Sequence, residues 1–133
     1  MNRHRKELVL EWLNKAEGDY TAAISLSKNR KKKNLLFIIA FHCQQAAEKH
    51  LKALLICHSI DFPKTHDLLE LLDLAITKDS FLLAIKKELQ ILNPFAVAFR
   101  YPGEDIDLED LKEILAAVKI VISILVKRIK EFI

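Results

Sequence analysis

The sequence predicts an all-α fold, an antiparallel up-and-down bundle of about five helices, and three observations lead to this prediction. The 133 residues include only 2 glycines and 3 prolines, too few for the turns of a sandwich or barrel. Hydrophobic residues make up 51% of the chain and charged residues 29%, which is typical of globular rather than disordered proteins. Apolar residues also recur at helical spacing in several long segments. We therefore expect one domain over residues 1–133.

The first helix is expected to run from about Arg5 to Ser27. Four residues form its apolar stripe: Trp12, Ala16, Ala23 and Leu26. Asp19 lies in the middle of this stripe, and a buried carboxylate needs a partner. Three residues are candidate partners: His50, Lys49 and Arg100. Asp19 then belongs either to a structural ion pair or to a functional site.

A basic run at residues 28–34 follows the first helix. Such a run is usually a solvated loop, and phosphate contact is the functional alternative. The second helix is expected over about residues 35–58, because this stretch contains neither glycine nor proline. A loop over residues 59–64 separates it from the next helix.

Thr65 is expected to cap the third helix, with Asp67 near the positive end of the helix dipole and the last turn near Ala75. Asp79 or Ser80 can cap a fourth helix that continues to about residue 92. The segment 93–107 is then the only long stretch expected to lack helix, and long loops in compact domains are often functional.

The last helix is expected to begin after Asp107 as its N-cap, with acidic residues in its first turn and basic residues in its last. Those five residues are Glu109, Asp110, Lys127, Arg128 and Lys130. Between residues 120 and 126 the helix is apolar around most of its circumference. It is therefore either a central, well-covered helix or one that packs against a second copy of the chain in a homodimer.

The two cysteines, Cys43 and Cys57, lie in apolar helical segments without a CxxC motif. We expect buried small hydrophobic residues rather than a zinc site or a redox pair. The most apolar segment, residues 114–126, contains a lysine and is shorter than the roughly 20 residues that span a bilayer. With no apolar signal segment after the basic start, a soluble cytoplasmic protein is expected. No metal or cofactor is expected, although a nucleotide is a possible ligand.

Polar residues of the second helix form a stripe at 3-4-3 spacing: His42, Gln45, Lys49 and Lys52. This stripe is either an ordinary solvated face or a polar wall that faces phosphate. His50 instead projects among apolar positions, as a core histidine satisfied by a hydrogen bond would. The chain has no Glu-x-x-His motif for a di-iron site and no glycine-rich loop for a P-loop or Rossmann site.

Two further groups of polar residues lie near the expected loops. The first consists of Lys64, Thr65, His66 and Asp67, and the second contains Arg100 and Tyr101. An arginine binds anions through its fork of donors, and a helix N-terminus offers backbone N–H groups to phosphate. Tyr101 could stack on a base.

These residues resemble a known family. The segment 40–55 (AFHCQQAAEKHLKALL) is similar to the signature helix of HEPN domains (higher eukaryotes and prokaryotes nucleotide-binding). Three other motifs resemble the same family in the same order: Trp12-x-x-x-Ala16-x-x-Asp19, Lys64-Thr65-His66-Asp67-Leu68 and Arg100-Tyr101-Pro102. The four motifs cover nearly the whole chain.

The resemblance implies a five-helix bundle that forms a homodimer, and a minimal nucleotidyltransferase as partner, often in a toxin–antitoxin pair. It also implies nucleotide binding, and many members are metal-independent ribonucleases. The site that it implies here consists of Asp19, Gln45, Lys49, His66 and Arg100, with Tyr101 beside them.

The sequence departs from the ribonuclease members in one motif. Those members carry an arginine followed, after four to six residues, by a histidine, and no arginine of this chain has one at that spacing. After Arg100, for example, the positions are Asp105, Ile106 and Asp107. The acid–base residue of RNA cleavage is therefore absent in that form, which favours a binding protein over an enzyme.

Three hypotheses follow. In the first, a non-catalytic module binds nucleotide or RNA, with Asp19 holding a cation in position and Tyr101 meeting a base. Four residues would meet phosphate: Lys49, Lys52, Lys64 and Arg100. In the second, the protein is a ribonuclease toxin that uses His66 or His42. In the third, the chain is a structural dimerisation module whose polar cluster only pins its loops.

Overall fold

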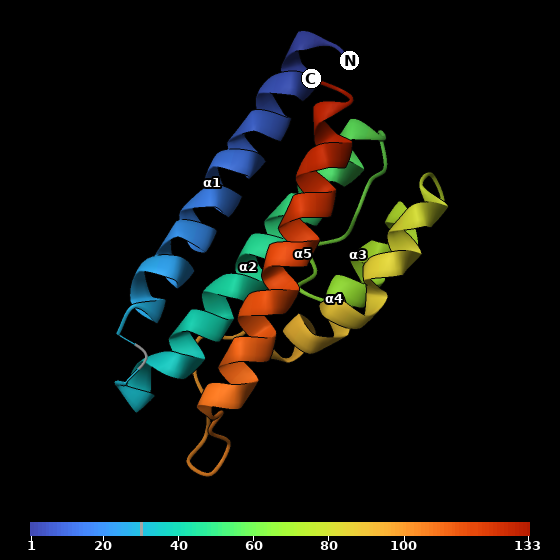
Figure 1. The fold of residues 1–133 in the computed structure, drawn as a ribbon. Coiled ribbons are helices and arrows are strands. Elements are labelled where there is room, and N and C mark those ends of the chain that lie inside the picture. Colours follow the sequence, from blue (N-terminus) through green and yellow to red (C-terminus); the bar gives the residue numbers. More distant parts are fainter. Residues whose placement is uncertain (30) are drawn as a thin grey trace.

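The computed structural model describes residues 1–29 and 31–133, and every regular element within these ranges is a helix. The elements are α1 (Arg3–Ser27), α2 (Lys33–Cys57), α3 (Leu68–Ala75), the 3-10 helix η1 (Ser80–Ile85), α4 (Lys86–Leu92), the 3-10 helix η2 (Asn93–Phe95) and α5 (Leu108–Lys130). The predicted all-α helical bundle is confirmed (Figure 1).

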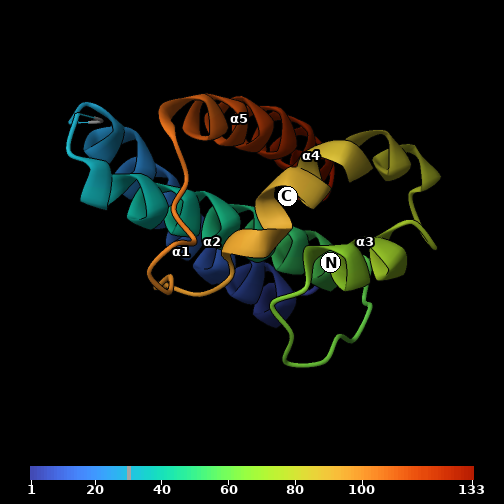
Figure 2. The same cartoon turned by 90° about the horizontal axis from the view of Figure 1, so that it is seen from below.

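Helix α2 lies at the centre of the bundle. It packs along α1 on one side and along α5 on another, and it also contacts α3 and α4. Helices α2 and α5 run in the same direction, while α1 and α4 run the opposite way (Figures 1 and 2). Helix α3 has only 8 residues, about 12 Å of helix, so it cannot cross the bundle as the long helices do.

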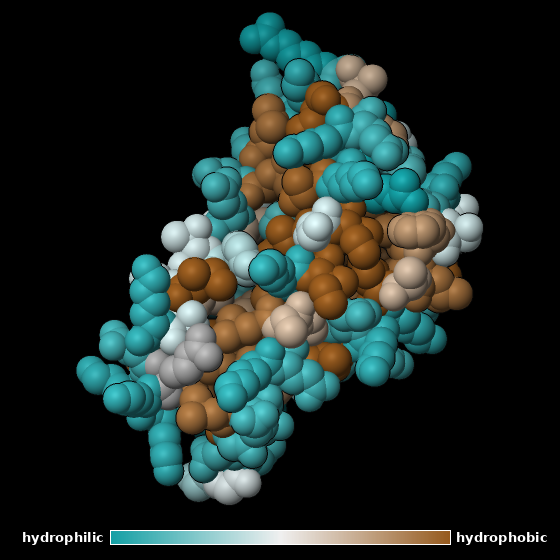
Figure 3. All heavy atoms as spheres, viewed as in Figure 1, coloured by the Kyte–Doolittle hydropathy of each residue, from teal (hydrophilic) through white to brown (hydrophobic). Residues whose placement is uncertain are grey.

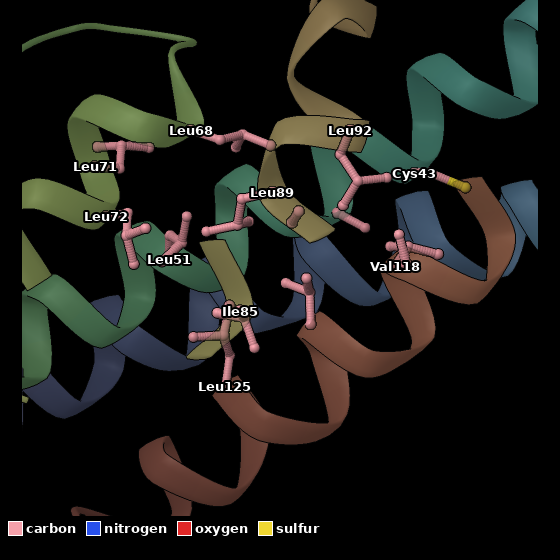
Figure 4. Close-up of a cluster of buried hydrophobic side chains, with 14 of the residues drawn as sticks. Cys43, Leu51, Leu68, Leu71, Leu72, Ile85, Leu89, Leu92, Val118 and Leu125 are labelled. Carbon is pink, nitrogen blue, oxygen red and sulfur yellow. The ribbon is translucent and has the colours of Figure 1, made fainter. Parts of the chain in front are cut away.

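The buried side chains form one hydrophobic cluster to which all five α-helices contribute. Figure 4 shows part of this cluster, including Leu51 of α2, Leu89 of α4 and Leu125 of α5. These three side chains are fully buried. The expected apolar stripes are confirmed too, because Ala16 and Ala23 of α1 are buried and Trp12 packs against the cluster.

Helix α1 begins two residues earlier than expected, because the Asn2 side chain accepts a hydrogen bond from the Arg5 backbone N–H and caps it. Helix α2 begins at Lys33, inside the basic run. Arg30 of that run lies outside the described residues. Helix α2 ends in a Schellman arrangement, with Ser59 in the left-handed region at φ 58° and the Ile60 N–H donating to the Leu55 carbonyl.

The predicted cap of the third helix was wrong. Asp67 caps α3, since its carboxylate accepts from the backbone N–H groups of Leu69 and Glu70. Thr65 lies just before the cap, where its hydroxyl accepts from the Asp67 N–H and donates to the Glu70 carboxylate. A side chain two residues outside the helix therefore braces the cap instead of forming it.

The fourth helix is divided. Asp79 caps the 3-10 helix η1 through the Phe81 N–H, as one of the two predicted caps, and α4 follows only from Lys86. The segment 93–107 is not the only long stretch without α-helix, because residues 58–67 are non-helical as well. Within 93–107, residues 93–95 form η2.

The prediction for the last helix is confirmed. Asp107 and Asp110 form a capping box at the start of α5, and Lys127, Arg128 and Lys130 occupy its last turn. Among the described residues, no helix combines the length and the apolar character that crossing a bilayer requires.

Candidate functional site

Asp19 holds two side chains of α2. Its Oδ1 accepts from His42 Nδ1 at 2.9 Å and its Oδ2 accepts from Lys49 Nζ at 2.5 Å. The Asp19 side chain is only 12% exposed, so the ion pair is largely shielded from water. Lys49 was one of the expected partners, whereas His50 and Arg100 are not partners. His42 was not among the candidates.

Glu48 of α2 is the centre of a second group, which again consists of a carboxylate, a lysine and a histidine. Its Oε2 accepts from Lys52 Nζ at 3.0 Å and its Oε1 accepts from His66 Nδ1 at 2.9 Å. The side chains of Glu48 and Lys52 are buried, while His66 remains 67% exposed. Each of the two carboxylates thus binds one lysine and one histidine, which satisfies the charge that burial would otherwise penalise.

Two glutamines connect this second group to the loop before α3. The buried Gln44 donates through Nε2 to the carbonyl of His66 at 2.9 Å. Gln45 donates in turn to Gln44 Oε1 at 2.7 Å. The 58–67 segment is therefore held on α2 through both the backbone and the ring of His66. Gln45 contributes to positioning Gln44 from the half-buried edge of the helix.

Arg100 occupies a different place, beside the start of α2. Its guanidinium lies 4.9 Å from the ring centroid of Phe37 and 4.8 Å from that of Phe95, and it donates to the Pro94 carbonyl at 3.2 Å. Its Nε is buried without a hydrogen-bond partner. Arg100 forms no ion pair with the part of the chain that the structure describes, so its charge is not neutralised by a carboxylate.

Tyr101 and Phe99 project from the same loop. Their rings meet edge to face at 5.7 Å between centroids and remain 67% and 58% exposed. Large exposed rings on a loop offer stacking surfaces to a ligand. Lys64 is also exposed, on the other non-helical segment.

The eight residues predicted to bind a ligand therefore divide into four groups. Asp19 and Lys49 are bonded to each other, while Gln45, Lys52 and His66 belong to the network around Glu48 and Gln44. Arg100 and Tyr101 lie on the 96–107 loop, and Lys64 stands alone. Lys49 and Lys52 are already neutralised by carboxylates, so Arg100 and Lys64 supply the uncompensated positive charge of the predicted set.

Sequence reasoning missed Gln44 and Glu48 as members of this network and His42 as the partner of Asp19. A signal for the first two was present, because both fall on the arc of α2 that holds Ala40 and Leu51. A polar residue among apolar positions was the same signal that singled out His50 and Asp19.

The other predictions about buried groups of α2 are confirmed. His50 is buried and donates through Nδ1 to the Ala46 carbonyl at 2.7 Å. Burial lowers its pKa, although the hydrogen bond to Ala46 and the nearby Glu17 carboxylate act in the opposite direction. Burial raises the pKa of Cys43 to about 12 and that of Cys57 to about 11, as for inert packed thiols.

The comparison with protein families bears directly on these motifs. A family model described as HEPN domain matches residues 9–129, nearly the whole chain. The chain belongs to the HEPN domain family. Membership associates it with nucleotide- or RNA-related function. Comparison with curated proteins and with solved structures gives no match.

Within this HEPN domain, the motifs that suggested the family meet around α2. The Asp19 motif of α1 bonds to the signature helix directly, and the Lys64–Leu68 motif bonds to it through His66. The Arg100 motif contacts α2 through Phe37, just before the signature segment. The family's motif residues thus contribute polar and aromatic contacts that join α1 and the two long non-helical segments to the central helix.

Proposed function

We propose that this HEPN domain is a nucleotide- or RNA-binding module that acts without the usual ribonuclease motif. The observation that carries the proposal is the Arg100 guanidinium, which has no carboxylate partner in the described chain and belongs to a loop that also exposes the rings of Phe99 and Tyr101. A guanidinium fork suits phosphate, and an exposed ring suits a base.

Acidic side chains near this loop restrict the extent of the positively charged surface that can bind a ligand. Lys31 and Lys33 of the basic run line a hollow of about 520 Å³, but Asp105, Asp107 and Glu109 line it too. These carboxylates offset much of the positive charge that a phosphate chain would meet. Binding therefore centres on Arg100 and the two rings rather than on the lysine run.

Isothermal titration calorimetry with ATP, repeated with a short single-stranded RNA, tests this proposal. We expect saturable binding that weakens at least tenfold in Arg100→Gln, since one charge-assisted contact is worth about 1.5–3 kcal/mol. Tyr101→Ala should weaken it by a similar factor through lost stacking, worth about 1–3 kcal/mol. Lys119→Gln is the matched control, because it removes one charge from an exposed position on α5. Undiminished binding by Arg100→Gln would show that the ligand lies elsewhere.

Ribonuclease activity is the second candidate function, and the Asp19–His42 hydrogen bond favours it. A carboxylate that bonds to Nδ1 fixes the tautomer and orientation of a histidine, as an acid–base residue requires. If His42 serves in this way, the protein should cleave structured RNA in the presence of a chelator, and His42→Ala should abolish cleavage. Absence of cleavage at every pH between about 6 and 8 would exclude this function.

We also propose a homodimer in the cytoplasm and a minimal nucleotidyltransferase as partner, together forming a toxin–antitoxin pair. Hydrophobic side chains gather over α5 and beside α1 on the face shown in Figure 3. A groove of about 290 Å³ there is lined mainly by apolar and aromatic side chains, with two polar residues among them: Leu13, Tyr20, Ile122, Val126, Glu17 and His50. This surface supports the dimer alternative for the last helix. Sedimentation equilibrium tests the dimer, and co-purification tests the partner.

A further inference from the structure

A cavity of about 590 Å³ opens at the end of the bundle where α1 begins and α2 ends. Its volume falls in the range of small-molecule sites, about 300–1,000 Å³. Trp12 and Phe62 line it together with aliphatic side chains of α1 and α2. It is separate from the Arg100 loop, since Ile56 in its wall and Phe37 beside Arg100 are roughly 28 Å apart along α2.

The two rings in this cavity are fixed from behind by a buried charge. Lys52 Nζ lies 5.5 Å from the centroid of Trp12 and 5.8 Å from that of Phe62. The ammonium is itself held by Glu48, whose side chain is buried. Both rings therefore have a defined place before any ligand arrives, which lowers the ordering cost of binding.

The charged side chains of the cavity wall are Arg5 and Asp61. Arg5 lines the cavity, is half-buried and forms no ion pair within the described residues. His4 lies beside it, and Asp61 is the acidic residue of the lining. An uncompensated guanidinium in a partly shielded wall attracts an anion, and its fork suits phosphate or carboxylate.

We propose that this cavity binds a small planar ring that bears an anionic group. The ring packs against Trp12 and Phe62, and the anion pairs with Arg5. Nucleoside monophosphates and aromatic carboxylates both combine a planar ring with an anionic group. The proposal therefore applies to both classes of ligand. This inference is independent of the RNA-binding role proposed for the Arg100 loop.

Fluorescence of Trp12 measures occupancy of the cavity directly, because it is the only tryptophan of the chain. We expect AMP or benzoate to change the emission saturably, and adenosine and inorganic phosphate, which lack the charge or the ring, to bind at least tenfold more weakly. If only AMP changes the emission, the ligand is a nucleotide. If only benzoate changes it, the ligand is an aromatic carboxylate. If neither ligand saturates the signal, or adenosine matches AMP, the proposal is overturned.

Three variants locate the anion. Arg5→Gln should weaken binding at least tenfold, whereas Asp61→Asn should strengthen it by removing the negative charge of the wall. Arg3→Gln is the matched control, because Arg3 lies on the same helix but is 94% exposed and pairs with Glu7. Equal binding by Arg5→Gln and Arg3→Gln would overturn the proposal. Arg100→Gln should leave the Trp12 signal unchanged, so failure here is distinguishable from failure of the Arg100 site.

Discussion

Replacing Glu48 by alanine is expected to lower the free energy of unfolding by about 3–5 kcal/mol. The change removes the carboxylate that neutralises Lys52, and the Lys52 side chain is only 8% exposed beneath Trp12 and Phe62. An uncompensated ammonium at that depth must either stay desolvated or push its covering rings aside. Urea denaturation followed by far-UV circular dichroism measures the loss.

A double replacement distinguishes the cost of leaving a buried charge unpaired from the cost of changing the volume of the buried side chains. Glu48→Met combined with Lys52→Met removes both charges at similar volume, so it should cost much less than Glu48→Ala alone. Glu7→Ala, which breaks the exposed Arg3–Glu7 pair, should change stability by less than about 1 kcal/mol. A Glu48→Ala variant as stable as Glu7→Ala would contradict the buried pair.

Local signals were sufficient for much of the fold. The start of α5 was predicted correctly because an N-cap and its first turn are set by neighbouring residues, here Asp107 and Asp110. The cap of α3 was misplaced for a related reason. Thr65 and Asp67 are both good N-cap residues two positions apart, and the choice depends on the Leu68 N–H, which bonds to Asn93 of a distant segment.

The candidate site depended more on tertiary structure. The sequence marked Asp19 as a charge within an apolar stripe, and that much follows from helical periodicity alone. Which residue of α2 meets it depends on how α1 and α2 are aligned along each other, and periodicity does not contain this information. His42 was therefore missed, although Lys49 lies on the same polar stripe and was identified.

The surroundings of Arg100 were also not predictable from local sequence. Its residue type and loop position predicted an anion-binding side chain, but nothing local indicated that Phe37 and Phe95 would flank it. The segment 93–107 reaches α2 only because η2 and α4 turn the chain back toward the start of that helix. Contacts between distant segments thus decided which predicted residues came together.

The second large effect is expected at Asp19, where replacement by asparagine should lower the free energy of unfolding by about 1–3 kcal/mol. Asparagine keeps the shape of the side chain but not its charge, so Lys49 loses its counter-ion and His42 loses a charged acceptor. The cost is smaller than at Glu48, because Lys49 and His42 remain 23% and 27% exposed and water can solvate them. Asp73→Asn, at an exposed position of α3, is the control and should change stability by less than about 0.5 kcal/mol.

The same variant also distinguishes a structural role of Asp19 from a role in binding. If Asp19 only joins α1 to α2, Asp19→Asn should lower stability and leave the affinity for ATP unchanged. If Lys49 faces a bound phosphate, removing the competing carboxylate frees its ammonium, and the affinity should rise while the stability falls. Calorimetric titration of the variant below its unfolding transition measures this difference. A fall in affinity at undiminished stability would contradict both roles, because it would require the carboxylate itself to contact the ligand.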